Sequence, residues 1–217
     1  MRTEAVEDYL KTIYLVETER GEVTTLELAA RMEISAPSVT GMLKKLAELK
    51  LVKHEPYHGV VLTAAGRKIA LEVIRHHRLL ELYLAEALGY SWDKVHAEAE
   101  KLEHHISEEF EDKIAALLGN PVTDPHGDPI PDAKGKIQKS NFIKLSETKV
   151  KGNYKVMGVT DHSPTFLKYL EKHELIIGAG ISIKTIEDFD NSIILVCQKK
   201  EVSISPKAAE CIIVQTI

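Results

Sequence analysis

The sequence lacks the features that mark secreted, membrane-spanning and disulfide-rich proteins. Its 217 residues include only two cysteines and no CxxC pair, which excludes a disulfide framework. No apolar run reaches the length of about 18 residues that a membrane span requires. The N-terminal stretch MRTEAVEDYLKTIY is amphipathic from its start, so a secretory signal is not expected. Phosphate-binding glycine loops and zinc-protease motifs are also missing. We therefore predict a cytoplasmic protein that spans no membrane and is not an enzyme.

The chain also lacks an excess of positive charge, and its formal net charge is −5. Residues 1–70 carry 10 basic and 10 acidic side chains, and residues 141–217 carry 10 and 9. Residues 71–140 carry only 8 basic against 14 acidic side chains, together with six of the ten histidines. An acidic, histidine-rich middle between two neutral ends predicts either a cation site or a solvated helical surface.

Residues 1–70 predict three short helices followed by a small hairpin. Apolar residues recur at helical spacing over residues 4–17 and again over residues 26–32. Ser35 is a suitable N-cap for a third helix, and Pro37 suits its first turn. Two short apolar runs around a polar turn then form the hairpin pattern. This order is that of a winged helix-turn-helix domain, whose third helix would enter the major groove of DNA.

The first turns of the third helix offer side chains that suit a DNA contact. Hydroxyls there can reach phosphates or base edges, and lysines one turn later suit phosphates. The segment is not net basic, so a small helical domain without a DNA partner is the alternative interpretation. The candidate DNA-contact residues are Ser35, Pro37, Ser38, Thr40, Lys44 and Lys45.

The rest of the chain predicts a helical segment followed by a small β domain. A long helix begins after Thr63, and a second helical pattern covers residues 92–118. Residues 121–135 contain four prolines and two glycines, which predicts a rigid irregular loop. Residues 136–150 look like a polar connector. Short β-branched runs with one short helix follow from about residue 151 and predict a small β-barrel. The expected fold class is mainly α with a small β domain.

Histidines and carboxylates recur at helical spacing in the acidic middle of the chain. Spacings of three and four place such side chains on one face of a helix, and two antiparallel helices can then converge on a divalent cation. Oxygen and nitrogen ligands without thiolates favour Mn²⁺, Fe²⁺, Co²⁺ or Zn²⁺. Burying so many ionisable groups without a cation would be costly, whereas on an exposed helix they would simply be solvated. The candidates are His77 and Glu81 on the first helix and His96, Glu100, Glu103 and His104 on the second.

Five segments, taken together and in order, match a pattern known from one family. They are DYLKTIY, SAPSVTGMLKKL, RHHRLLE, KVHAEAEKLEHHIS and DPHGDPIP. The sequence therefore resembles the metal-dependent transcriptional regulators typified by the diphtheria toxin repressor and the manganese transport regulator. The resemblance covers nearly the whole chain. It implies a winged helix-turn-helix domain over residues 1–70, a helical dimerisation and metal-binding domain over residues 71–140, and an SH3-like (FeoA-like) domain over residues 141–217 with a linker at its start.

The resemblance implies a primary metal site that joins the first helix to the dimerisation helices. Iron-type members carry Met at the position of Asp8 and Cys at the position of Glu100, so the carboxylates of this chain are the manganese-type pattern. Lys11 departs from the two-domain manganese regulators, which carry Glu there and use it in a binuclear site. The primary ligands implied are Asp8, His77, Glu100, Glu103 and His104.

A second metal site is implied near the SH3-like domain, in one of two versions. By similarity to streptococcal-type manganese regulators, its ligands would be Glu81, Asp124, His126 and Asp161. In the iron-type version they would be His77, Glu81 and His96, with His162 as the nearest candidate from the C-terminal domain. We favour the first version because Asp124 and His126 flank a proline that restricts their backbone.

The function implied is that of a homodimeric regulator that binds a double-stranded DNA operator when Mn²⁺ is bound and represses metal-uptake genes. An iron-responsive repressor of the same architecture, with Fe²⁺ as its metal, is the first alternative, and Co²⁺ or Zn²⁺ can substitute in vitro. A metal buffer protein without DNA binding is the alternative from another class.

The other histidines and the two cysteines are not expected to bind metal. We expect surface or wing positions for His54, His58, His76, His105 and His173, and buried thiols for Cys197 and Cys211.

Overall fold

A computed structural model describes residues 2–54, 59–138 and 141–217, with the side chain of His54 excepted. These residues form two compact units. The first comprises Met1–His77, Leu102–Glu108 and Pro131–Lys136, and the second comprises Arg78–Lys101, Glu109–Ile130 and Ile137–Ile217. Within the described residues, every helix is too short or too polar to cross a bilayer.

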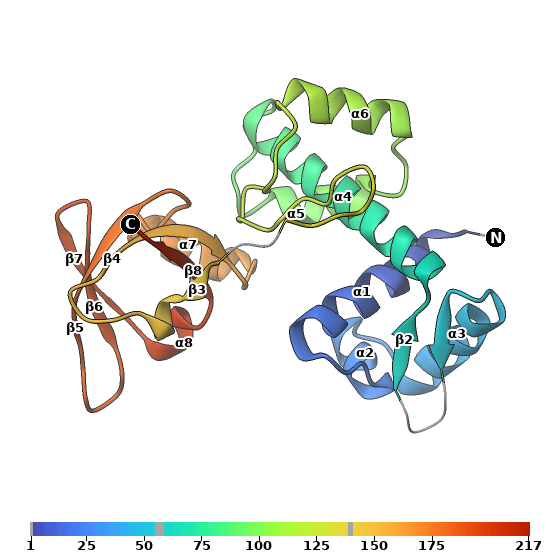
Figure 1. The fold of residues 1–217 in the computed structure, drawn as a ribbon, viewed down its shortest axis with the longest axis horizontal. Coiled ribbons are helices and arrows are strands. Elements are labelled where there is room, and N and C mark those ends of the chain that lie inside the picture. The colour runs from blue at the N-terminus through green and yellow to red at the C-terminus, as the bar shows by residue number, and fades with distance from the viewer. Residues whose placement is uncertain (1, 55–58, 139–140) are drawn as a thin grey trace. The chain divides into compact units, whose positions relative to one another are not determined.

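The first unit contains the helix-turn-helix and hairpin that the sequence predicts (Figure 1). Ser35 caps the third helix by accepting a hydrogen bond from the backbone amide of Ser38, and Pro37 lies in the first turn, as predicted. The hairpin strands pair in antiparallel fashion, and the turn between them, including His58, lies outside the described residues. The elements are α1 (Glu4–Arg20), α2 (Thr25–Arg31), α3 (Ala36–Glu48), β1 (Val52–His54) and β2 (Val60–Leu62).

One apolar core joins these elements. Leu10 and Ile13 of α1 and Leu43 and Leu46 of α3 are fully buried in it. Burying a leucine or isoleucine side chain contributes about 1.5–3 kcal/mol, so this core is the main term that holds the helices together. Leu49 is 38% exposed, because it lies at the C-cap, one residue beyond the end of α3.

Three further helices follow in the chain. They are α4 (Ala64–Glu86), α5 (Val95–Leu102) and α6 (Glu108–Leu117). Thr63 accepts a hydrogen bond from the amide of Gly66 at 3.1 Å, so the predicted cap begins α4. The helical pattern predicted over residues 92–118 is divided between α5 and α6, with a break at residues 103–107.

The C-terminal part of the second unit is a six-stranded antiparallel sheet in the order β3-β8-β4-β5-β6-β7 (Figure 1). This confirms the predicted β domain. Residues 136–150 are more than the polar connector that we expected, because they include β3 and a 3₁₀ turn whose Leu145 is fully buried. The elements are β3 (Ile143–Lys144), β4 (Asn153–Val159), α7 (Pro164–Lys172), β5 (Gly180–Ile186), β6 (Ile193–Cys197), β7 (Lys200–Ile204), α8 (Pro206–Ala209) and β8 (Ile212–Thr216).

Candidate metal centres

The first candidate centre is built on the polar face of α1. Asp8 and Lys11, one turn apart, lie on this face, and Leu10 and Ile13 on the opposite face enter the core. Glu103 and His104 come from the short segment that follows α5. Nε2 of His104 lies 2.9 Å from Oδ1 of Asp8 and 3.4 Å from Oε1 of Glu103.

These three side chains could hold one metal ion. Asp8, Glu103 and His104 each offer a ligand atom, and the three atoms all lie within 4.8 Å of one another. Two carboxylate oxygens and one imidazole nitrogen are a hard donor set that suits Mn²⁺ or Fe²⁺. We call Asp8, Glu103 and His104, with the neighbouring His77, the first cluster.

Glu103 is the centre of the hydrogen-bond network in the first cluster. Its side chain is fully buried, and it accepts hydrogen bonds from Nζ of Lys11 at 2.6 Å and from Nδ1 of His77 at 2.5 Å. Burial alone would raise the pKa of Glu103, but the bond from His77 and the charge of Lys11 outweigh it and hold that pKa below its usual value. Burial raises the pKa of Asp8, against the opposing effects of His104 and Lys11.

The structure thus brings four of the five predicted primary residues together. Glu100 belongs to the second unit, where it is exposed on α5 with a carboxylate oxygen 3.8 Å from Nε2 of His96. His76 was expected at the surface, and this was wrong: it is 6% exposed, and its Nδ1 donates to the backbone carbonyl of Glu103 at 3.0 Å. Glu7 was not predicted as a site residue, although helical spacing places it on the same face of α1 as Lys11.

The second candidate centre lies entirely within the second unit. Glu81 of α4 and Asp124 and His126 of the proline-rich loop are all buried, and their ligand atoms lie within 4.8 Å of one another. We call these three residues the second cluster. His96 donates from Nδ1 to Oε1 of Glu81 at 3.1 Å, so it contacts the cluster from α5.

The backbone of the proline-rich loop aims Asp124 into this cluster. Oδ1 of Asp124 accepts hydrogen bonds from the amides of His126 at 2.8 Å and Asp128 at 2.9 Å, which turns Oδ2 toward Glu81 and His126. Gly127 has a φ of +87°, and a Cβ there would lie 2.0 Å from the carbonyl oxygen of Met157. Only glycine therefore allows the loop to lie this close to β4.

Two atoms of the second cluster show that a cation would fit it. Oδ2 of Asp124 and Nδ1 of His126 are buried without a hydrogen-bond partner among the described residues, which is rare for buried polar atoms. Nε2 of His126 donates to the carbonyl of Trp92 at 2.8 Å, so Nδ1 is the nitrogen that faces Glu81, at 3.7 Å. An ion between these oxygens and this nitrogen would satisfy both atoms. Arg78 places a positive charge near Asp124, with its Nε 3.8 Å from Oδ2.

Protons compete for the same atoms. Burial, the carboxylate of Asp128 and that of Glu81 raise the pKa of Asp124 well above its usual value. Burial lowers the pKa of His126, but Glu81 and Asp124 outweigh it and raise that pKa overall. Binding of a divalent cation would therefore expel protons from this cluster.

The other residues predicted for the second site have different positions. The imidazole of His162 stacks on that of His126, with ring centroids 4.5 Å apart, so it contacts the cluster through its ring face. Asp161 lies in the turn before α7, where Oδ1 accepts a hydrogen bond from the amide of Ser163 at 2.8 Å, and it is outside the three-residue group. The cluster thus contains three of the four residues of the favoured version, Glu81, Asp124 and His126, and two residues of the other version, His96 and His162, contact it.

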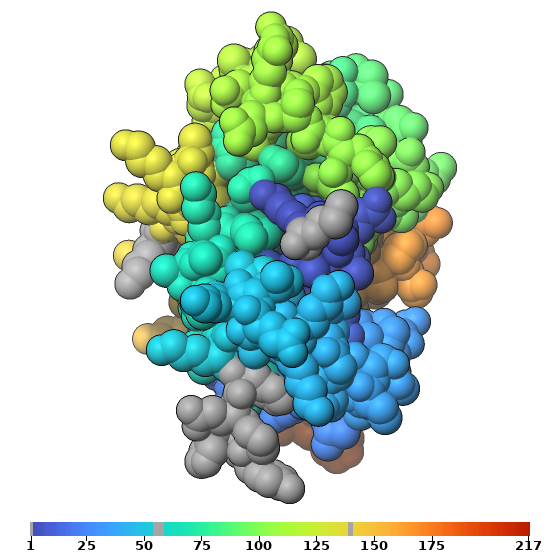
Figure 2. Space-filling view, turned by 90° about the vertical axis from the view of Figure 1, so that its right-hand side faces the viewer, coloured from blue at the N-terminus to red at the C-terminus, as the bar shows by residue number. Residues whose placement is uncertain are grey.

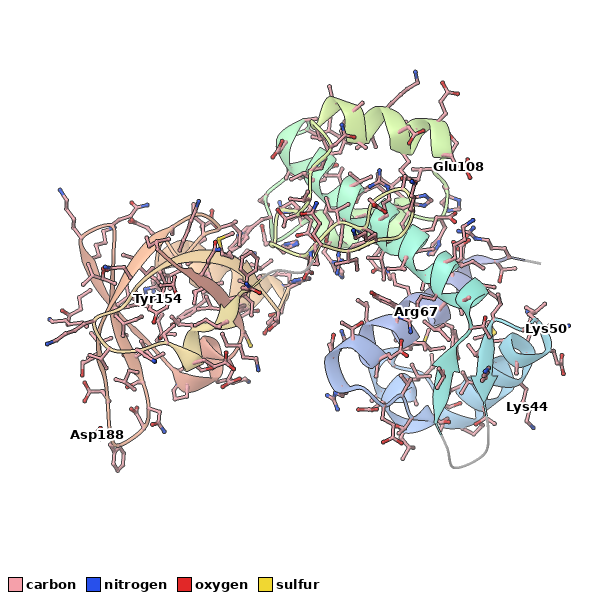
Figure 3. The ribbon with its side chains drawn as sticks, in the orientation of Figure 1. Lys44, Lys50, Arg67, Glu108, Tyr154 and Asp188 are labelled. Atoms are coloured by element: carbon pink, nitrogen blue, oxygen red, sulfur yellow. The ribbon has the colours of Figure 1, made fainter. Side chains whose placement is uncertain are left out.

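The predicted DNA-contact residues form one side of α3. Figure 2 shows this side of the first unit, with α3 in light blue to cyan at its surface. Lys44 and Lys45 are exposed, and Figure 3 shows the side chain of Lys44 extending from the helix. Thr40 is half-buried, and its hydroxyl donates to the carbonyl of Ala36 at 3.0 Å. The exposed hydroxyls of this side are those of Ser35 and Ser38, which lie 2.8 Å apart beside the exposed Pro37.

Three family models match successive parts of the chain. Residues 1–60 match the N-terminal DNA-binding domain of iron-dependent repressors, and residues 63–132 match their metal-binding and dimerisation domain. Residues 143–216 match the FeoA domain.

Individual proteins are similar to the chain over different lengths. The iron-dependent repressor IdeR of Mycobacterium leprae is 38% identical over 128 residues, which is 59% of this chain and 56% of IdeR. The chain therefore spans little more than half the length of such curated relatives. The transcriptional regulator MntR of Escherichia coli O6:H1 is 41% identical over 50% of this chain and 69% of MntR. A solved structure of a manganese-dependent transcriptional repressor in complex with manganese is 35% identical, with a TM-score of 0.89, and covers 98% of this chain and 100% of that one.

Proposed function

This chain belongs to the family of metal-dependent transcriptional repressors that includes IdeR, MntR and the diphtheria toxin repressor, and we propose that it binds an operator when Mn²⁺ is bound. Members of this family are repressors and not enzymes, which confirms the prediction made from the missing catalytic motifs. A DNA-bound regulator of this kind acts in the cytoplasm.

The observation that carries the proposal is the position of the first cluster on α1. Asp8 can reach Glu103 and His104 only in the arrangement of α1 that the structure shows, and the opposite face of α1 packs in one core with α3. A metal ion in the first cluster would therefore stabilise the arrangement that presents α3 to DNA. Asp8, His77, Glu103 and His104 are our proposed primary ligands, and Glu100 remains a ligand predicted from the family resemblance.

Manganese is favoured by the chemistry of the donors. Both clusters offer carboxylate oxygens and imidazole nitrogens, and neither includes a thiolate or thioether. Hard oxygen donors suit Mn²⁺ better than softer ions, although Fe²⁺ differs little in its preferences. A solved structure of a manganese-dependent repressor is similar to this chain along its full length at 35% identity, whereas the match to the IdeR of Mycobacterium leprae covers about half of that protein. Because Fe²⁺ differs little from Mn²⁺ in its ligand preferences, an iron-responsive repressor is the second candidate.

We further propose Glu81, Asp124 and His126 as ligands of a second ion. The two unpartnered buried atoms described above support this assignment. His96 and His162 would lie beside the ion. His96 would orient Glu81 through its hydrogen bond, and His162 would orient His126 by stacking on its ring. Asp161 would cap the turn before α7.

The DNA partner would be a twofold-symmetric operator bound by a homodimer. Ser35, Ser38, Lys44 and Lys45 on the exposed side of α3 would contact it, and the match to a dimerisation domain supports a pair of such helices. Two recognition helices related by a twofold axis require half-sites about one helical turn of DNA apart or a multiple of it.

The test is a selection from random duplexes, performed without oxygen in Mn²⁺, Fe²⁺, Zn²⁺ or chelator. We expect enrichment of a twofold-symmetric site only with metal, and most strongly with Mn²⁺. Affinity for that site should fall steeply with salt. Lys44→Ala combined with Lys45→Ala removes two lysines from each protomer, so it should reduce the salt slope of the dimer by about four while leaving Mn²⁺ binding unchanged. Tight Mn²⁺ binding without any enriched sequence would refute the repressor function and favour a metal buffer.

A further inference from the structure

The imidazole of His104 lies between two adjacent acidic residues of α1. Its Nδ1 is 2.5 Å from Oε2 of Glu7, and its Nε2 is 2.9 Å from Oδ1 of Asp8. The side chains of His104 and Glu7 are 8% and 10% exposed, so their contact is shielded from water, whereas the side chain of Asp8 is 39% exposed. The two carboxylates therefore contact different nitrogens of the same ring.

The geometry of imidazole assigns different roles to the two acids. The ring nitrogens point to opposite sides, and the Nε2 side also faces Oε1 of Glu103 at 3.4 Å. An ion bound at Nε2 is within reach of Asp8 and Glu103, whereas Glu7 lies behind the ring. By accepting the hydrogen on Nδ1, Glu7 leaves Nε2 without a proton and with its lone pair directed at the ion.

Glu7 is itself held by a residue outside the cluster. Nε of Arg2 forms an ion pair with Oε1 of Glu7, and Nη1 of Arg2 lies 2.8 Å from Oε1 of Glu72 on α4. The two oxygens of Glu7 are thus both engaged, one by Arg2 and one by His104. This occupancy and the charge of Arg2 keep Glu7 from turning toward the ion.

We propose that Glu7 is a positioning residue of the first cluster, which fixes the orientation and tautomer of His104 so that Nε2 is the metal ligand. Arg2 supports this role by neutralising and fixing Glu7. The inference rests on the proposed function, because it assumes that His104 binds a metal ion.

The chain offers a matched control for this role. One turn before Glu7, Glu4 on the same helix pairs with His105 at 3.6 Å, and both side chains are 63% exposed. Glu4→Met removes the same chemical group from the same pair of segments, but away from the cluster. Glu7→Met removes the acceptor with little change in side-chain volume, and Glu7→Gln keeps a weaker, neutral acceptor.

Mn²⁺ affinity of the first cluster would be measured without DNA, in full-length chains that also carry Asp124→Asn to weaken the second cluster. We expect Glu7→Met to lower that affinity by about 10–100-fold, which is typical when a carboxylate behind a ligating histidine is removed. Glu7→Gln should lie between Glu7→Met and the unmodified residue, and Glu4→Met should have no effect. If Glu7→Met does not fold, the graded loss in Glu7→Gln still tests the role.

Nitrogen-15 NMR of the protein loaded with Zn²⁺, a diamagnetic substitute for Mn²⁺, gives a readout that a merely structural role would not change. We expect His104 to carry its hydrogen on Nδ1 when Glu7 is present, and to lose this preference in Glu7→Met but not in Glu4→Met. Wild-type affinity and tautomer in Glu7→Met would overturn the inference. Failure of the parent chain to bind Mn²⁺ at the first cluster would instead overturn the proposed function.

Discussion

At the scale of single residues, Lys11 places a permanent positive charge against a carboxylate that a metal ion would use. Its Nζ donates to Oε1 of Glu103 at 2.6 Å, and both side chains are buried. In the metal-free protein this ammonium compensates the charge of Glu103. When an ion binds, the same ammonium opposes it, because two unit charges about 4 Å apart interact by roughly 4 kcal/mol at an effective dielectric constant of 20.

Lys11→Met should therefore bind Mn²⁺ at least about tenfold more tightly at the first cluster, which corresponds to about 1.4 kcal/mol. Its metal-free form should be less stable, by up to the roughly 3–5 kcal/mol that a broken buried ion pair costs, because Glu103 would keep only its histidine partners. Calorimetric Mn²⁺ titration and thermal unfolding in chelator measure the two effects. Lys11→Arg, which keeps the charge, is the control. Unchanged or weaker Mn²⁺ binding by a folded Lys11→Met protein would contradict this account.

Asp124 makes the stability of the metal-free protein depend on pH. Burial and the neighbouring carboxylates raise the pKa of Asp124 in the folded state above its unfolded value of about 3.9. The folded state therefore holds this proton more tightly, and the contribution of Asp124 to stability falls as pH rises from the unfolded pKa to the folded one.

Asp124→Asn should remove this loss of stability with rising pH. Relative to the unmodified chain, the variant should gain stability in chelator as pH rises from about 4 toward neutral, and it should lose most of the stabilisation that Mn²⁺ gives through the second cluster. Thermal unfolding across this pH range, with and without Mn²⁺, measures both changes. Asp161→Asn, outside the cluster, should behave as the unmodified chain does. A stability difference that stays constant with pH would show that Asp124 does not bind the proton.

At the scale of secondary structure, elements with strong local signals could be predicted from the sequence. The third helix has a capping serine, a proline in its first turn and a regular apolar face, and the structure confirms it at Ala36–Glu48. By contrast, β3 has two residues, and the burial of Leu145 beside it depends on packing against distant strands. No local pattern in residues 136–150 reveals such a contact.

The candidate sites could be predicted to a similar extent. Family resemblance and helical spacing named Asp8, Glu103 and His104, because these residues occur in recognisable motifs. Spacing did not show that His76 turns inward to the backbone of Glu103, or that Glu7 contacts the far side of His104. Both contacts join segments far apart in the sequence, and they depend on how α4 and α1 pack against the segment after α5.

At the scale of the whole molecule, α1 links the proposed metal site to the proposed DNA site. One face of α1 carries Asp8 of the first cluster, and the other face carries Leu10 and Ile13 into the core that also contains Leu43 of α3. A packed core has discrete arrangements and transmits small shifts, so an ion that fixes α1 also restricts α3. The effect must be reciprocal, because metal and DNA would stabilise the same arrangement.

Operator DNA should therefore tighten Mn²⁺ binding by the same factor by which Mn²⁺ tightens operator binding. A coupling free energy of about 1–3 kcal/mol predicts a factor of roughly 5–150 for each. The two factors come from Mn²⁺ titrations with and without the selected duplex and from DNA titrations with Mn²⁺ or chelator. The double variant Lys44→Ala, Lys45→Ala should bind Mn²⁺ normally and show little change when duplex is added at a concentration that saturates the unmodified chain. If saturating operator leaves the Mn²⁺ affinity of the unmodified chain unchanged, the two binding events are not coupled, and the proposed metal-dependent binding of the operator is wrong.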